Sequence, residues 1–411
     1  MRTVGSNPTL SVIARNHADY DEIFSEVEAP FAFVDLDSMW ANADSMLARS
    51  GTKPIRVASK SIRCRNLIER ILDYNPRFRG VMTFTLPETL WLAESGFDDL
   101  LLAYPTTSRE ALAKLAVRNA AFPERAPILM VDCVEHLDLI ESVLGHDASP
   151  VRLCLELDAS WVSMKGRVRA GARRSPVRSP EQAVTLAESI AGREKMELVA
   201  VMAYEGQIAG VGDQPPGQPV RSRMIKWMQK HSVEEISDRR ARVVDQVRKV
   251  ADIEIVNGGG TGSLQSTSRE PAVTEVTAGS GFFAPAQFDH YSGFSLEPAA
   301  AFAIPVVRRP GPGVVTALGG GYLSSGSADA ARLPVPWLPE GLKLDPEEGA
   351  GEVQTPLLGP PADRLGIGDR VFMRHNKAGE LCERFDSLLL VEGGEIVDEV
   401  PTYRGDGHSF L

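Results

Sequence analysis

The chain has 411 residues, of which 43% are hydrophobic and 24% are charged, an ordinary globular composition with room for two domains. Its net charge of -11 argues against nucleic acid or an anionic membrane surface as the main partner. No run reaches the roughly 18 apolar residues of a membrane span, and the N-terminus lacks the apolar core of a secretion signal. Cys64, Cys133, Cys154 and Cys382 are scattered without Cys-x-x-Cys spacing. We therefore expect a cytoplasmic protein with reduced cysteines, Cys133 and Cys154 in its core.

From residue 31 the sequence repeats a short apolar run followed by a stretch with helical spacing. The apolar runs predict strands at 31–37, 55–62, 79–84, 98–105, 127–133, 151–158, 196–206, 253–260 and 273–283. Strands that alternate with helices over roughly 260 residues predict a (β/α)8 TIM-type barrel. An open, doubly wound parallel sheet is the alternative, because the pattern alone does not separate the two.

After residue 291 the pattern changes to short β-like runs separated by proline and glycine turns, which predicts an all-β C-terminal domain. The segment 333–362 is rich in proline and glycine, and we expect it to be irregular. The predicted organisation is an N-terminal lead at 1–28 that packs with the β domain, a barrel at 29–290 and the β domain at 291–411.

The predicted strand in "IRVASKSIRC", residues 55–64, carries Lys60 near its carboxyl end. One explanation is a lysine whose stem packs while its ammonium reaches water. The other is a reactive amine, since a desolvated lysine can act as a nucleophile. In a barrel the chemistry lies at the carboxyl ends of the strands, and that is where Lys60 is expected.

Two glycine clusters follow the last two predicted barrel strands, "NGGGTGS" at 257–263 and "AGSGFF" at 278–283. Barrels often bind phosphate with these two loops, because glycine lets backbone N–H groups approach an anion closely. Thr261, Ser263 and Ser280 could add hydroxyl donors, although each cluster could also be a plain turn. A phosphate site together with a strand-end lysine favours pyridoxal phosphate, whose aldehyde forms a Schiff base with lysine.

Lys60, the downstream "GGGTGS" and the C-terminal β domain resemble the fold-type III pyridoxal phosphate enzymes, which include alanine racemase, D-threonine aldolase and D-serine dehydratase. The resemblance covers nearly the whole chain and is greatest for the D-threonine aldolase and D-serine dehydratase branch. Three segments are similar to that branch, residues 30–46, "MAYEGQIAG" at 202–210 and "RHNKAGELCERFDSLLLVEGGEIVDEVPTYRG" at 374–405.

The resemblance implies a role for each matching residue. Lys60 would be the Schiff-base lysine, and Tyr204 would lie near the pyridine ring. Arg169 of "RAG" would contact the phenolic oxygen of the cofactor, with Arg167 as an alternative because of the inserted "SWVSMKG". The remaining cofactor-binding residues would be Asn257, Gly259, Gly260, Thr261, Gly279, Ser280 and Gly281.

The chain departs from the family pattern at two places. Gln207 stands where the family has a histidine, and an amide can form hydrogen bonds but cannot act as an acid or base. The family's metal motif matches His375-Asn-Lys377, in which a protonated lysine is no ligand. Glu380 or Cys382 could supply the second ligand of a zinc or manganese ion at His375. A histidine that hydrogen-bonds to the backbone of a turn is the alternative.

The resemblance implies a homodimeric pyridoxal phosphate lyase that acts on a D-configured β-hydroxy-α-amino acid, by aldol cleavage or dehydration. Three alternatives stay open. A racemase would need a second base, for which Tyr291, Tyr322 and Tyr403 are candidates. A non-catalytic pyridoxal phosphate-binding protein would resemble the barrel alone. A barrel aldolase would use Lys60 directly on a sugar phosphate.

Overall fold

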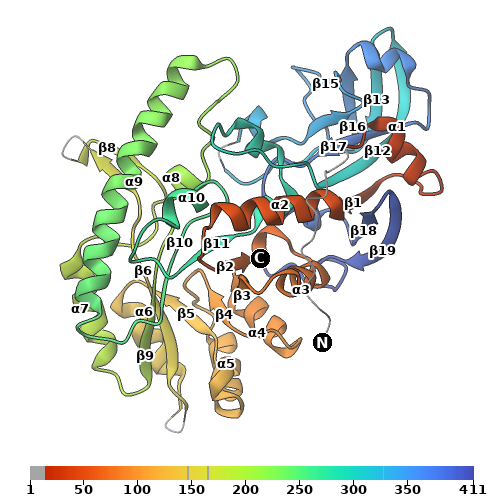
Figure 1. Cartoon of the computed structure of the whole chain (residues 1–411). Coiled ribbons are helices and arrows are strands. Elements are labelled where there is room, and N and C mark those ends of the chain that lie inside the picture. The colour runs from red at the N-terminus through yellow and green to blue at the C-terminus, as the bar shows by residue number, and fades with distance from the viewer. Residues whose placement is uncertain (1–13, 146–147, 164–165, 327) are drawn as a thin grey trace. The chain divides into compact units, whose positions relative to one another are not determined.

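The computed structural model describes residues 14–145, 148–163, 166–326 and 328–411 (Figure 1). The chain divides into two compact units. The barrel unit holds residues 46–279, 290–294 and 409–411, and the sheet unit holds residues 280–289 and 295–408 together with the chain up to residue 45.

The barrel unit contains a closed barrel of eight strands in the order β10-β11-β2-β3-β4-β5-β6-β9. Each pair of neighbours is parallel, which confirms the predicted (β/α)8 barrel and excludes the open sheet. The strands are β2 (Ile55–Ala58), β3 (Phe78–Thr83), β4 (Leu100–Leu102), β5 (Ile128–Val131), β6 (Val151–Glu156), β9 (Met196–Ala203), β10 (Ile255–Gly258) and β11 (Glu275–Ala278).

Helices follow most of these strands, as the repeated pattern predicted. They are α3 (Arg65–Tyr74), α4 (Leu86–Glu94), α5 (Arg109–Ala121), α6 (Val134–Val143), α7 (Pro180–Ala191), α8 (Gly206–Ala209), α9 (Pro219–Val247) and α10 (Leu264–Thr267). The caps are local, since the side chains of Thr85 and Ser108 accept backbone N–H groups at the starts of α4 and α5. The long helix α9 runs beside α7 in Figure 1.

A small antiparallel hairpin interrupts the alternation after β6. It consists of β7 (Trp161–Ser163) and β8 (Val168–Ala170), and it occupies the segment that the sequence marks as an insertion. The hairpin lengthens the connection from β6 to α7.

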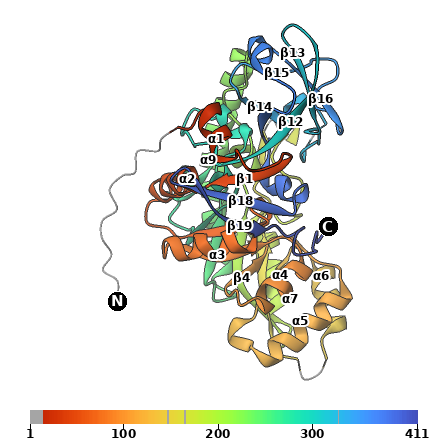
Figure 2. The ribbon, with the colours of Figure 1, turned by 90° about the vertical axis from the view of Figure 1, so that its right-hand side faces the viewer.

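The sheet unit is built on a nine-stranded sheet with the path β15-β16-β13-β12-β1-β18-β19, to which β17 and β14 are added beside β12. Figure 2 shows β1, β18 and β19 side by side. The strands are β1 (Phe31–Asp35), β12 (Ala300–Gly311), β13 (Val314–Leu318), β14 (Val335–Leu338), β15 (Lys343–Leu344), β16 (Gln354–Leu358), β17 (Arg370–Arg374), β18 (Ser387–Glu392) and β19 (Glu395–Pro401). This confirms the predicted β-rich C-terminal region.

Two features of the sheet unit differ from the sequence expectation. Strand β1 was expected with the barrel, but it pairs antiparallel with β12 and parallel with β18. These partners lie more than 250 residues away, so local spacing could not reveal them. The segment 333–362 is not irregular, since it contains β14, β15 and β16.

Helix α1 (His17–Ile23) belongs to the sheet unit and packs on its aromatic core. The rings of Tyr20 and Phe24 lie 5.0 and 4.8 Å from the ring of Phe33, centroid to centroid. Helix α2 (Leu36–Arg49) follows β1 directly. Among the described residues, no helix combines the length and the apolar character needed to cross a membrane.

Candidate active site

Lys60 lies just beyond the carboxyl end of β2, on the single 3-10 turn η1 (Ser59–Ser61). Its side chain is half-buried, and Nζ donates a hydrogen bond to the hydroxyl of Tyr104 at 3.4 Å. Tyr104 follows β4, so the two side chains come from the same end of the barrel. The structure therefore places Lys60 at the barrel rim where chemistry is expected.

Arg174 joins this group, and sequence reasoning missed it. Its guanidinium carbon lies 5.2 Å from the ring centroids of both Tyr104 and Tyr204, within cation–π range. Its Nη1 lies 3.9 Å from Oε1 of Glu156, the last residue of β6. Arg174 thus connects Glu156 to the two tyrosines, one of which contacts Lys60.

Arg169, which the resemblance assigned to the cofactor, has a different neighbour. It lies on the β8 strand of the inserted hairpin, and its Nη2 is paired with Asp158 at 2.9 Å. Asp158 also pairs with Arg178 at 3.2 Å. The cofactor role of Arg169 stays a prediction, and Arg174 is the arginine of this loop that the structure brings to Tyr104.

Glu156 is a buried carboxyl at the rim, with its side chain 5% exposed. The pKa of Glu156 is raised to about 7, chiefly by burial and also by the charges of Asp132 and Asp158, while Arg174 lowers it. Glu156 can therefore hold a proton near neutral pH, next to the Arg174 guanidinium.

Tyr204 follows β9 and faces the glycine loop after β10. Burial raises the pKa of Tyr204 to about 12 against the lowering effect of Arg174. A Cβ added to Gly260 would lie 3.2 Å from Cε2 of Tyr204 and 2.9 Å from Cβ of Ala209. Glycine is therefore required for the loop to pass this close to the tyrosine ring.

The carboxylate of Glu205 accepts hydrogen bonds from the loop after β10. The N–H of Gly259, whose φ is +88°, donates to Oε2 of Glu205 at 3.3 Å, and the Ser263 hydroxyl donates to Oε1 at 3.0 Å. The N–H of Gly260 donates to Oγ of Ser263 at 3.1 Å. Ser263 thus serves the loop's own framework, while Thr261 is buried within the loop.

Gly279 ties the second glycine cluster to the turn that carries Lys60. A Cβ at Gly279 would lie 2.6 Å from the carbonyl oxygen of Ala58 and 2.9 Å from Cβ of Ser61. These residues flank Lys60, so any side chain at position 279 would displace the lysine turn. Ser280 and Gly281 follow in the chain and begin the short helix α11 (Ser280–Phe283).

Asn257 is engaged in a polar network inside the barrel. Its Nδ2 donates to Oε1 of Glu275 and to Oγ1 of Thr277, both at 2.8 Å. Glu275 in turn pairs with Arg56. The side-chain amide of Asn257 is therefore hydrogen-bonded within the protein. Its contact with the cofactor stays a prediction.

Gln207 is buried, and its Nε2 donates to the carbonyl of Ala159 at 2.8 Å and to Oγ of Ser232 at 2.6 Å. Its Oε1 is buried without a hydrogen-bond partner. Gln207, at the position where the resemblance implies a histidine, thus forms hydrogen bonds to the segment after β6 and to α9.

The predicted metal ligands lie in the sheet unit. His375 follows β17 and is fully buried, with its ring edge-on to Phe283 at 6.2 Å between centroids. Glu380 and Cys382 lie on the turn η7 (Ala378–Glu383), and both Glu380 oxygens accept the N–H of Ser325 at 3.0 Å. Burial raises the pKa of Tyr322, and the charges of Glu380 and Cys382 also raise it.

Sequence reasoning also missed a cluster at the end of β5. Within the part of the chain that the structure describes, Asp132, Cys133 and His136 form the one group of three metal-ligating side chains whose ligand atoms lie within 4.8 Å of one another. Cys133 was expected in the core, but it is half-buried and forms the N-cap of α6.

Comparison with known proteins identifies the fold. No protein-family model matches the sequence, and no curated protein sequence is similar to it. Solved structures do match: D-threonine aldolase from Filomicrobium marinum has 20% identity and a TM-score of 0.73 over 93% of this chain and 96% of its own. D-threo-3-hydroxyaspartate dehydratase from Delftia sp. HT23 has 18% identity and a TM-score of 0.69 over 92% and 97%.

The chain has the fold of the fold-type III pyridoxal phosphate enzymes. An alanine racemase-like protein from Idiomarina loihiensis matches as well, with 13% identity and a TM-score of 0.70 over 92% of this chain and 98% of that one. The resemblance drawn from the sequence is therefore confirmed at the level of the fold, across nearly the whole length.

Proposed function

We propose that this chain is a pyridoxal phosphate-dependent lyase acting on a D-configured β-hydroxy-α-amino acid. The observation that carries the proposal is the position of Lys60, whose amine meets the Tyr104 hydroxyl at the carboxyl rim of the barrel. Two structures of the same fold are named for enzymes that act on D-threonine and D-threo-3-hydroxyaspartate, both β-hydroxy-α-amino acids.

The residues at the rim fit the cofactor. Lys60 offers the amine, and Gly260 and Gly279 leave no room for a Cβ between their backbone and Tyr204 or the Lys60 turn, so both loops run as bare backbone close to these residues. We propose that the loop at 257–263 and Ser280 hold the phosphate, and that Arg174 meets the phenolic oxygen. Arg174 replaces Arg169 in this role because its guanidinium, unlike that of Arg169, contacts Tyr104.

When bound, the cofactor supplies an aldehyde for the amine and a ring that takes up the electron pair of the breaking bond. The chain's own residues orient the groups and hold protons around it. Tyr104 accepts the hydrogen bond of the Lys60 amine and so fixes its direction. Glu156, with its pKa near 7, holds a proton at its carboxyl close to the Arg174 guanidinium.

We also propose a divalent metal at His375, with Cys382 or Glu380 as a further ligand. An imidazole with a thiolate or a carboxylate suits zinc, which as a Lewis acid would lower the pKa of a β-hydroxyl. We also propose a homodimer, on the resemblance alone. Measuring the mass of the protein in solution tests this.

Racemisation has weaker support from the residues. A racemase would need a tyrosine that gives up its proton readily, but burial raises the pKa of both Tyr291 and Tyr322. The Tyr291 hydroxyl is also bound to the carbonyl of Ala209 at 2.9 Å. Tyr403 is fully buried.

Product analysis tests the proposed reaction. The cofactor-loaded protein is incubated with D-threonine, D-serine and D-threo-3-hydroxyaspartate, each beside its L-isomer as the matched control. Glycine with an aldehyde marks aldol cleavage, and a keto acid with ammonia marks dehydration. We expect one of these outcomes with a D-isomer and neither with its L-isomer. Chelation of the metal should abolish product formation. Racemisation of alanine without any cleavage would contradict it.

A further inference from the structure

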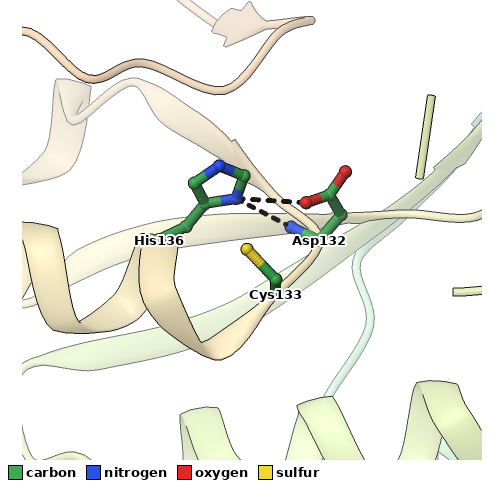
Figure 3. Close-up of side chains that lie close together, drawn as sticks. All are labelled: Asp132, Cys133 and His136. Carbon is green, nitrogen blue, oxygen red and sulfur yellow. Dashed lines mark hydrogen bonds and ion pairs between the residues drawn. The ribbon is translucent and has the colours of Figure 1, made fainter. Parts of the chain in front are cut away.

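Asp132, Cys133 and His136 lie at the junction between β5 and α6. Asp132 is the residue directly after β5, Cys133 is the N-cap of α6, and His136 lies in the first turn of that helix. Figure 3 shows the three side chains turned toward the same space, with Nδ1 of His136 facing the Asp132 carboxylate. The three residues of the sequence Asp-Cys-x-x-His thus come close together because β5 ends where α6 begins.

The donor atoms lie near the separations that one small cation requires. Nδ1 of His136 lies 3.2 Å from Oδ1 of Asp132, and the Cys133 sulfur lies within 4.8 Å of both. Around a tetrahedral zinc ion, a nitrogen and an oxygen ligand are about 3.4 Å apart, and a nitrogen and a sulfur ligand about 3.6 Å. The histidine and aspartate atoms lie close to this distance, and the Cys133 sulfur lies within 4.8 Å of both.

The present hydrogen bonding leaves the imidazole accessible to a cation. The backbone N–H of Asp132 lies 3.4 Å from Nδ1, which is long for a hydrogen bond. The His136 and Asp132 side chains are 21% and 12% exposed, so an ion can enter from solvent.

The cluster lies at the rim that carries the chemistry. The register pairs Val131 of β5 with Leu155 of β6, so the next residues, Asp132 and Glu156, stand side by side at the carboxyl ends of their strands. The same end of the barrel carries Lys60 and Tyr104. An ion held here would lie at the end of the barrel that carries the candidate active site.

We propose that Asp132, Cys133 and His136 bind a zinc-type divalent cation with three protein ligands and one open coordination position. A thiolate with imidazole and carboxylate selects zinc over magnesium, which prefers oxygen ligands only. The thiolate and the carboxylate together neutralise the ion's two charges. This site is separate from the metal proposed at His375, and it does not depend on pyridoxal phosphate.

Alkylation of Cys133 tests the site. All four cysteines lie in the described residues, and Cys133 is the one that is not buried, so a thiol reagent should label it first in the folded protein. Zinc in molar excess over both proposed sites should slow this labelling at least ten-fold, as read by peptide mapping, and magnesium at the same concentration should not. Labelling of Cys64, Cys154 or Cys382 would reveal an unfolded variant, so the assay carries its own folding control.

Matched variants assign the ligands and separate the two proposed metals. His136→Ala and Asp132→Asn should remove zinc protection, with Cys133 still labelled selectively, whereas His375→Ala should leave protection unchanged. Because the measurement uses no cofactor and no substrate, its failure leaves the proposed lyase function untouched. Zinc that does not slow labelling, or that protects His136→Ala equally well, would overturn the proposal.

Discussion

Two polar groups in the barrel differ in how completely their charges are paired. Inside the barrel, Arg56 is 1% exposed, and its Nε and both Nη atoms donate to Glu275 or to Asp99 at 2.6–3.0 Å. At the rim, the Lys60 contact is 3.4 Å and the nearest carboxylate of Arg174 is 3.9 Å away. In the Arg56 group the guanidinium has protein partners at short distances. At the rim, the contacts of Lys60 and Arg174 are longer, so both cations can still bind a ligand.

Glycine supports both groups but in different ways. A Cβ at Gly80 would lie 2.4 Å from Nη1 of Arg56, so glycine makes room for a protein side chain. At Gly260 and Gly279 the missing Cβ brings backbone close to Tyr204 and to the Lys60 turn. The comparison teaches that buried charge marks the barrel's framework, while incomplete pairing marks the site where chemistry is expected.

The largest effect on stability is expected from disrupting the Arg56 group. Arg56→Met should lower the free energy of unfolding by about 3–5 kcal/mol, because it leaves the buried Glu275 carboxylate without its cation. Urea unfolding measures this. The control is Arg152→Met, which removes an exposed pair with Glu254 and should cost at most about 1 kcal/mol. Equal losses in the two variants would contradict the distinction.

A smaller, pH-dependent effect is expected at Glu156. Its folded pKa of about 7 lies above the unfolded value, so its contribution to stability is present below the unfolded pKa and is lost as pH rises through 7. Between pH 5 and pH 8, chelator-treated wild type should therefore lose up to about 3 kcal/mol relative to Glu156→Gln. Identical pH profiles in urea unfolding would show that Glu156 does not titrate in this range.

The smallest predicted effect compares the two arginines of the loop after β6. Arg174→Gln should weaken pyridoxal phosphate binding by about 1.5–3 kcal/mol, the range of a hydrogen bond to a charged group. Arg169→Gln should change it less, since Arg169 is paired with Asp158. Titration of each variant with the cofactor gives both affinities. A larger loss of cofactor affinity in Arg169→Gln would instead favour Arg169 as the residue that contacts the phenolic oxygen.

The barrel and Lys60 could be predicted because their signals are local. Apolar runs, helical spacing and glycine clusters each lie within a few consecutive residues, and a closed barrel brings the strand ends to one rim. Arg174 could not be predicted, because the Arg-x-Gly pattern matched Arg169, which lies on β8 of the hairpin and pairs with Asp158 instead. Asp132, Cys133 and His136 offered a local signal, but an apolar run made Cys133 look like a core residue.

The central claim is that Lys60 is the amine that holds the cofactor at the rim. Borohydride reduction of the loaded protein, followed by peptide mapping, tests it most directly. We expect a single labelled lysine at position 60, and in Lys60→Ala we expect loss of both the label and the visible absorption band with the fold retained. A label on any other lysine of the wild-type protein would contradict the account.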